Sequence, residues 1–305
     1  MTDRCMRLSE LGGVDTLTVG GKAANLHRLV SAGFPVPDGI VVPVDEYDAF
    51  MRSTGLRDAV AELLEGARAG QLSDLSRRIR GMISSAAADE GLSGAILEEL
   101  SRAGPDALWA VRSSAVSEDL EDASFAGQLD SYLNVPTADV PHMVKRCWAS
   151  YWNERAIAYR DDSRVDHLRH GIAVVVQRMV DARSSGILFT VDPVRGRSDR
   201  VLIEASWGLG EAIASGLVTP DRFECDRRSG EVVSRAINDK AKQVLLRPGG
   251  SAVSEVREED RMVPSVSDAE LRLLVDIGAR IEKHFGGPQD IEWAIEGDRV
   301  FILQS

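Results

Sequence analysis

The chain has 305 residues, a formal net charge of −12 and a hydrophobic content of 44%. This length exceeds what a single hydrophobic core usually serves, so we expect two lobes or two domains. The negative charge argues against nucleic acid as the main partner, but it leaves room for a small anionic ligand in a local basic pocket.

Cysteine spacing and hydropathy exclude further classes of protein. Cys5, Cys147 and Cys225 have neither the spacing of a zinc site nor that of a disulfide framework, which indicates reduced thiols. The first residues lack the apolar segment of a signal peptide. No apolar run reaches the roughly 18 residues that a membrane helix needs. We therefore predict a cytoplasmic protein without a membrane partner.

Helical periodicity dominates the first half of the chain. Apolar residues recur at helical spacing from Ala23 to Val30, and Gly33 followed by two prolines ends that helix. The elements expected after it are a strand over 39–44, several helices across 45–103, a strand over 108–111 and a helix over 138–159.

Short strands dominate the second half. A β-branched apolar run over 171–179 predicts a strand that is buried on both faces. The elements expected after it are strands over 185–191, 200–205, 221–225 and 231–236, a helix over 267–285, and strands over 290–294 and 299–304. The fold class is therefore α/β or α+β, with an antiparallel second half and a lobe boundary within 181–197. We assign residues 1–185 to an N-terminal lobe and 186–305 to a C-terminal lobe.

Two cations stand in contexts that suit phosphate binding. Lys22 follows a pair of glycines at the start of a predicted helix, where backbone N–H groups and a lysine can meet an anion. Arg112 ends a strand and enters a pair of serines, and a planar guanidinium suits phosphate oxygens. Each has a simpler interpretation alone, namely a surface lysine beside a glycine turn and an arginine paired with a nearby carboxylate.

Two further segments are rich in glycine and small residues. The stretch 124–128, with Gly127 near its end, can fold over phosphates or form an ordinary turn. In 203–221 a strand gives way to a glycine turn, and Glu204 at the strand end suits a ribose or metal contact. A buried glycine corner is an equally good interpretation of this second segment.

A carboxylate and an amide stand on the last two predicted strands. These strands flank a turn at Gly297, and their pairing makes Glu292 and Gln304 diagonal neighbours on one face. Mg²⁺ accepts both kinds of oxygen beside nucleotide phosphates. An exposed edge position is the simpler interpretation of the glutamate, but these strands are otherwise largely apolar, so a polar side chain there needs a partner. Two cations, a glycine loop and this pair together suit phosphoryl transfer from a nucleotide.

These motifs resemble the N-terminal ATP-grasp domain of the dikinase family, which includes phosphoenolpyruvate synthase, pyruvate phosphate dikinase and rifampicin phosphotransferase. The resemblance covers almost the whole chain. It is carried by the stretches GGKAANLHRL, GFPVPDG, AVRSSAVSEDLEDASFAGQLDSYLNV, VVVQRMV, SGILFTVDP, IEASWGLGEAIASGLVTPD and QDIEWAIEGDRVFILQS.

The resemblance implies a two-lobed ATP-grasp fold with ATP and Mg²⁺ between the lobes. Lys22 and Arg112 would be the catalytic phosphate cations, and Glu292 with Gln304 would hold the metal. Lys240 is a weaker candidate for a phosphate contact. The nucleotide contacts expected from the motifs and the resemblance together are Lys22, Arg112, Gly127, Ser131, Gln177, Met179, Val180, Glu204, Glu292 and Gln304. Those from Gln177 to Val180 would meet adenine through backbone groups.

In this family a histidine on a swivelling domain, within a TxxGGxxxH-like motif, relays phosphate to an acceptor such as pyruvate or an antibiotic hydroxyl. None of the five histidines of this sequence stands in such a motif. We therefore expect the phosphohistidine on a separate domain or polypeptide. The family's last strand also continues into Arg-Pro, whereas this sequence stops at Ser305. A nucleotide-binding regulatory module without turnover is therefore the alternative to an ATP-dependent phosphotransferase. A self-contained ATP-grasp ligase is disfavoured because no acceptor motif is found.

Overall fold

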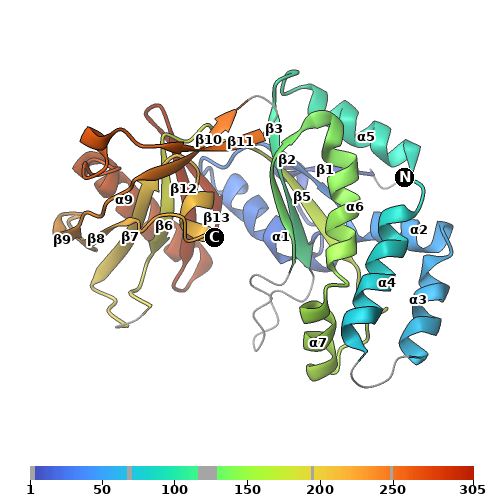
Figure 1. Cartoon of the computed structure of the whole chain (residues 1–305). Helices are drawn as coiled ribbons and strands as arrows, with labels where there is room; N and C mark the ends of the chain where they lie inside the picture. The colour runs from blue at the N-terminus through green and yellow to red at the C-terminus, as the bar shows by residue number, and fades with distance from the viewer. Residues whose placement is uncertain (1–3, 67–70, 116–128, 194–195, 248–249) are drawn as a thin grey trace. The chain divides into compact units, whose positions relative to one another are not determined.

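The protein consists of two compact units (Figure 1). Unit 1 comprises Met1–His27 and Asp38–Met179, and unit 2 comprises Arg28–Pro37 and Val180–Ser305. The correspondence of these units to the two predicted lobes stays a prediction. The structure, a computed structural model, describes residues 4–66, 71–115, 129–193, 196–247 and 250–305.

A five-stranded antiparallel sheet forms the centre of unit 1 in its described residues. Its strands, in spatial order, are β1 (Met6–Arg7), β2 (Gly39–Val42), β5 (Ile172–Arg178), β3 (Leu108–Ala115) and β4 (Ser131–Pro136). The central strand β5 is buried over all but its last residue, as its β-branched sequence predicts. β3 runs four residues beyond its predicted end at Val111, so the arginine and the serine pair lie within the sheet.

Six α-helices contribute to the core on one face of this sheet, within the described part of unit 1. They are α2 (Val44–Ser53), α3 (Leu56–Glu65), α4 (Leu72–Ser85), α5 (Glu90–Ser101), α6 (Val140–Ser150) and α7 (Glu154–Asp162). Every second side chain of the strands, such as Val111 and Val174, points into this core. α1 (Thr16–Ser31) meets the opposite face, where Val19 contacts Ser114 of β3.

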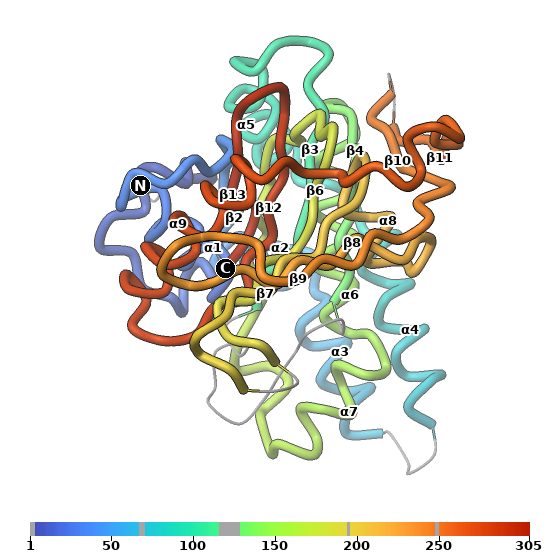
Figure 2. The backbone as a smooth tube through the Cα atoms, turned by 90° about the vertical axis from the view of Figure 1, so that its left-hand side faces the viewer, coloured from blue at the N-terminus to red at the C-terminus, as the bar shows by residue number. Residues whose placement is uncertain are grey.

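Unit 2 contains a six-stranded antiparallel sheet in the residues that the structure describes. Its strands, in spatial order, are β13 (Arg299–Gln304), β12 (Asp290–Glu296), β6 (Ser184–Phe189), β7 (Arg200–Trp207), β8 (Asp221–Asp226) and β9 (Val232–Ala236). Figure 2 shows the backbones of β12 and β13 side by side. α9 (Asp268–Phe285) covers one face, and Gly278 permits this packing because a Cβ there would lie 2.8 Å from Leu188 Cδ2.

Two features of the chain differ from the expected elements. The helix predicted over 138–159 is two helices, α6 and α7, because the chain turns between them at Trp152, whose carbonyl accepts from Ser76 Oγ at 2.7 Å. A hairpin of β10 (Lys242–Arg247) and β11 (Gly250–Glu255) was not predicted. Half of its strand residues are exposed and only Val244 is buried, so the apolar alternation that marks a strand is weak. The short α8 (Glu211–Ala214) follows β7.

The predicted fold class is confirmed. Both sheets are antiparallel and are covered by helices, which agrees with the predicted α+β class. The three cysteines are free and buried, in agreement with their spacing. Among the described helices, none has both the length and the apolar content that crossing a membrane requires.

Candidate functional site

A kink in α1 places Lys22 beside β3. Gly20 has φ 74° and ψ 164°, so the helix restarts after it. A Cβ at Gly20 would lie 2.3 Å from the Ser114 carbonyl oxygen, which is why glycine is required there. Ser114 Oγ donates to the Val19 carbonyl at 3.0 Å and accepts from the Ala23 N–H at 3.2 Å. The serine therefore holds the chain on both sides of the kink.

Lys22 lies in the first turn after this kink. Its Nζ donates to the Ser113 carbonyl oxygen at 3.4 Å, which keeps the ammonium next to β3. The start of a helix favours anions because its first N–H groups lack helical partners and its dipole is positive there. The glycine pair and the serine pair, which are far apart in sequence, thus form one structure.

Ser113 is held from the opposite face of the sheet. Its Oγ donates to the Asp130 carbonyl at 3.0 Å and lies 3.2 Å from Ser150 Oγ of α6. The Cys147 thiol donates weakly to the same Asp130 carbonyl at 3.9 Å, and burial raises the pKa of Cys147 to about 12. Because successive side chains of a strand alternate, the two serines anchor β3 from its two faces.

Arg112 shares the α1 face of the sheet with Ser131. The arginine pairs with Ser131 on β4 and with Val175 on β5, and directly opposed residues of antiparallel strands point to the same side. Ser114, two residues after Arg112, points to this side as well. Arg112 and Ser131 therefore lie on the face that α1 covers, and Lys22 lies beside β3, whereas a nucleotide contact by these residues stays a prediction.

Gln177 lies on the same face of β5, where it pairs with Ala110. Its side chain is 2% exposed, and its Nε2 has no hydrogen-bond acceptor among the described residues. A buried amide donor without an acceptor is unfavourable, so this position favours a ligand or water that accepts a hydrogen bond.

The backbone after Gln177 is already partly bonded. The Met179 N–H donates to the Leu108 carbonyl at 2.8 Å, and the Val180 carbonyl accepts from the Ala182 N–H at 2.9 Å. A backbone contact between this segment and adenine stays a prediction, and it would have to use other groups or replace these bonds.

A β-bulge in unit 2 sets Glu292 directly opposite Gln304. An unbroken hairpin would pair Glu292 with Leu303 and would point Gln304 to the other face. The register shifts after Glu292, so that Trp293 pairs with Ile302 and Glu292 with Gln304. The expected diagonal arrangement is therefore wrong, since the pair is direct and depends on the bulge.

Glu292 belongs to a row of residues that crosses the sheet. Ile187 of β6 pairs with Glu292 on one side and with Glu204 of β7 on the other. Arg222 of β8 pairs with Glu204. Gly186 permits the close pairing here, because a Cβ at this position would lie 1.8 Å from the Glu204 carbonyl oxygen. The row places both glutamates and Arg222 on one face.

Asp290 is a carboxylate that the motifs did not single out. It lies on β12 two residues before Glu292, opposite Phe189, and so points to the same face. Burial raises its pKa, because the charged form loses hydration. The period-two alternation in QDIEW is the sequence signal that identifies it.

The expectation that Lys240 contacts phosphate is wrong. The side chains of Lys240 and Asp221 are both 0% exposed, and an ion pair of 2.6 Å joins them. Lys240 Nζ also donates to the Asn238 carbonyl at 3.0 Å. The second oxygen of Asp221 accepts from the N–H and the hydroxyl of Ser265, each at 2.9 Å. This buried pair joins β8 to the segment that precedes β10.

The donor atoms around Glu292 fit magnesium. Within the described ranges, no group of three or more histidine, cysteine, aspartate or glutamate side chains could hold a metal. Mg²⁺ does not need such a group, since it commonly binds one or two protein oxygens and completes its shell with water and nucleotide phosphates. Glu292 and Gln304 are opposed in register, and the oxygens that their side chains carry suit that mode. Gly127, expected on the phosphate loop, lies outside the described residues.

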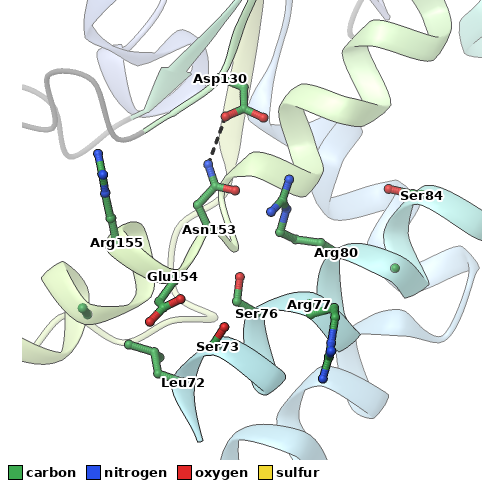
Figure 3. A pocket seen from close by; sticks show the side chains of 12 residues that line it. Leu72, Ser73, Ser76, Arg77, Arg80, Ser84, Asp130, Asn153, Glu154 and Arg155 are labelled. Carbon is green, nitrogen blue, oxygen red and sulfur yellow. Dashed lines mark hydrogen bonds between the residues drawn. The ribbon is translucent and has the colours of Figure 1, made fainter. Parts of the chain in front are cut away.

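A groove of about 1010 Å³ lies elsewhere in unit 1, between α4 and α7 (Figure 3). Arg80 and Arg155 line it from the two helices, on either side of Asn153. None of the predicted nucleotide contacts lines this groove. Its link to the site is Asp130, which lines the groove and immediately precedes Ser131.

Comparison with known proteins gives a family and several relatives. Residues 16–305 match the family described as pyruvate phosphate dikinase, AMP/ATP-binding domain. The chain is 45% identical, over 97% of its length, to a probable phosphoenolpyruvate synthase of Methanothermobacter thermautotrophicus. It is 42% identical, over 98% of its length, to a rifampicin phosphotransferase of Streptomyces sviceus. The chain spans 44% and 35% of the lengths of these two relatives, which is less than half of each.

Proposed function

Because the chain belongs to the family of the pyruvate phosphate dikinase AMP/ATP-binding domain, we propose that it binds Mg·ATP and donates a phosphoryl group to a histidine on a separate swivelling domain or partner. The histidine would pass the group to a small-molecule acceptor, such as pyruvate or an antibiotic hydroxyl. ATP would be converted to AMP and phosphate. Relatives more than twice as long as this chain support such a division between domains.

The observation that carries this proposal is the contact between Gly20 and Ser114. It joins a helix start, a lysine and an arginine-bearing strand, three features that each favour phosphate. A glycine turn with a surface lysine would not need a serine from another strand to close the kink. Lys22 and Arg112 would neutralise phosphate charge and orient the transferred group.

The remaining residues of unit 1 would position the nucleotide. The buried Nε2 of Gln177 would donate to an acceptor on the base or the ribose, which would satisfy an otherwise unpartnered group. Ser131 lies opposite Arg112 and would contact the phosphates together with the segment that contains Gly127.

In unit 2, Glu292 and Gln304 would hold magnesium through their side-chain oxygens. A bound magnesium ion would reduce the negative charge of the nucleotide phosphates. Glu204, on the same face two strands away, would accept a hydrogen bond from a ribose hydroxyl.

A nucleotide-binding module without turnover is the second candidate. It predicts nucleotide affinity without phosphoryl transfer even when a histidine domain of a relative is supplied.

Calorimetric titration with a non-hydrolysable ATP analogue, with and without Mg²⁺, tests the proposal. We expect magnesium-dependent binding, and Glu292→Ala should weaken it about tenfold, or about 1.4 kcal/mol. Glu231→Ala is the matched control, because Glu231 is an exposed carboxylate of unit 2 outside the row. Absence of binding by the unaltered chain would contradict the function, and undiminished binding by Glu292→Ala would contradict the metal assignment.

A further inference from the structure

Hydrogen bonds from three elements converge on Asp130. Its carboxylate accepts from Asn153 Nδ2 at 3.1 Å and from the Tyr132 hydroxyl at 2.8 Å. Its carbonyl oxygen accepts from Ser113 Oγ at 3.0 Å. Figure 3 shows Asp130 and Asn153 facing each other at the groove between α4 and α7. One residue thus joins β3, β4 and the start of α7.

The chemistry of this network requires a carboxylate. Burial and the hydrogen bond to Asp130 raise the pKa of Tyr132, so its hydroxyl stays protonated and donates. Asn153 also presents a donor, its Nδ2. A carboxylate can accept from two donors at its two oxygens, whereas the amide of an asparagine has one oxygen and one NH₂ group.

The network flanks Arg112 on two strands. Asp130 immediately precedes Ser131, the first residue of β4, which pairs with Arg112. On β3, Ser113 immediately follows Arg112 and donates to the Asp130 carbonyl. A shift of Asp130 would therefore displace the backbone on both sides of the arginine.

We infer that Asp130 is a positioning residue, which holds Arg112 at the place where it meets the nucleotide phosphates. This inference rests on the proposed function, since it takes Arg112 as a phosphate cation. Asp130 acts through the arginine and does not itself contact the nucleotide. A residue that only stabilises unit 1 would lower the unfolding temperature without a specific effect on nucleotide affinity.

Exchange of the side chains of Asp130 and Asn153 provides the test. The affinity of the 305-residue chain for a non-hydrolysable ATP analogue with Mg²⁺ is measured by calorimetry, with thermal unfolding in parallel. Asp130→Asn places an NH₂ group against one of its two donors, so we expect about a tenfold weaker affinity. Combination with Asn153→Asp restores an acceptor for that NH₂ group, so the double variant should return to within about threefold of the original affinity.

Further variants separate positioning from stability. Ser84→Ala alters an exposed groove residue that has no described hydrogen bond to Asp130, and it should leave the affinity unchanged. Arg112→Ala removes the residue through which Asp130 acts, so adding Asp130→Asn to it should cause no further loss. If Asp130→Asn does not fold, Tyr132→Phe gives the same test. It removes one donor and keeps the carboxylate, so we expect a smaller loss of nucleotide affinity.

The outcomes are distinct. The positioning role would be overturned if the losses of affinity from Asp130→Asn and Arg112→Ala added in the double variant. It would also be overturned if Asp130→Asn lowered the unfolding temperature and left the affinity unchanged. Failure of the exchanged pair to recover affinity, with both variants folded, would overturn it as well. Failure of the unaltered chain to bind the analogue would instead overturn the proposed function, and the inference would fall with it.

Discussion

The candidate residues of the two units are held in place by different means. In unit 1, β3 is fixed by side-chain hydrogen bonds on its two faces, from Ser114 toward α1 and from Ser113 toward Asp130. In unit 2, strand register and one bulge place Glu292 opposite Gln304. The first arrangement should be sensitive to small changes in polar side chains. The arrangement in unit 2 should tolerate such side-chain changes and should be disrupted by substitutions that alter the backbone.

The largest effect is expected from Gly186→Ala in unit 2. A Cβ there would lie 1.8 Å from the Glu204 carbonyl oxygen and 2.7 Å from Trp293, in the middle of the sheet. Neither neighbour can move without disrupting the sheet, so we expect a loss of about 4 kcal/mol in the free energy of unfolding. Urea unfolding measures this loss. Gly287→Ala is the control, because no atom lies within 4 Å of its added Cβ.

Gly20→Ala should have a smaller effect on stability and a larger one on the site of unit 1. Its Cβ would lie 2.3 Å from the Ser114 carbonyl at a φ of 74°, so the kink must open and Lys22 must move away from β3. We expect about 2–3 kcal/mol of destabilisation. Nucleotide affinity should fall at least tenfold in the folded protein.

The matched control for this change is Gly12→Ala, since the space around Gly12 is open. Calorimetry and urea unfolding of both variants give affinity and stability separately. The loss of nucleotide affinity is compared with the loss of unfolding free energy for Gly20→Ala and for Gly186→Ala. If the ratio of the two losses were the same in both variants, the kink at Gly20 would have no special role in nucleotide binding.

Elements set by local periodicity could be predicted from the sequence. β5 and α9 match their expected bounds within one residue at each end, because a β-branched run and a capped amphipathic pattern are local signals. The break between α6 and α7 was missed, since it depends on the tertiary contact of the Trp152 carbonyl with Ser76.

The sequence singled out the residues of the candidate site but did not show how they lie relative to one another. Lys22 and Arg112 stood out jointly, because a lysine at a helix start after glycines and a guanidinium at a strand end both suit phosphate. Their proximity depends on a kink closed by Ser114, which pairs with residues over 90 positions away. Lys240 could not be recognised as buried, because its partner Asp221 lies in another element.

The smallest expected effect concerns two carboxylates, one in each unit. Arg4 lowers the pKa of Asp89 to about 2 mainly through side-chain hydrogen bonds. Backbone N–H groups of Ser229 and Arg228 are the main cause that lowers the pKa of Asp226 to about 2. Because both values are depressed, the associated stability is present above the ordinary carboxyl pKa of about 3.9 and is lost as the pH falls toward about 2.

Salt should separate the two carboxylates. At 1 M ionic strength the Debye length shrinks to about 3 Å, which weakens the partly exposed pair of Arg4 and Asp89 more than the short backbone bonds to Asp226. Carboxyl titration by NMR should show the pKa of Asp89 rising with salt and that of Asp226 changing less. Arg4→Gln should raise the pKa of Asp89 and leave Asp226 unchanged. If salt shifted the pKa values of Asp89 and Asp226 equally, the ion pair and the backbone hydrogen bonds would be screened alike. The side-chain contacts of unit 1 would then be no more sensitive to salt than the backbone contacts of unit 2.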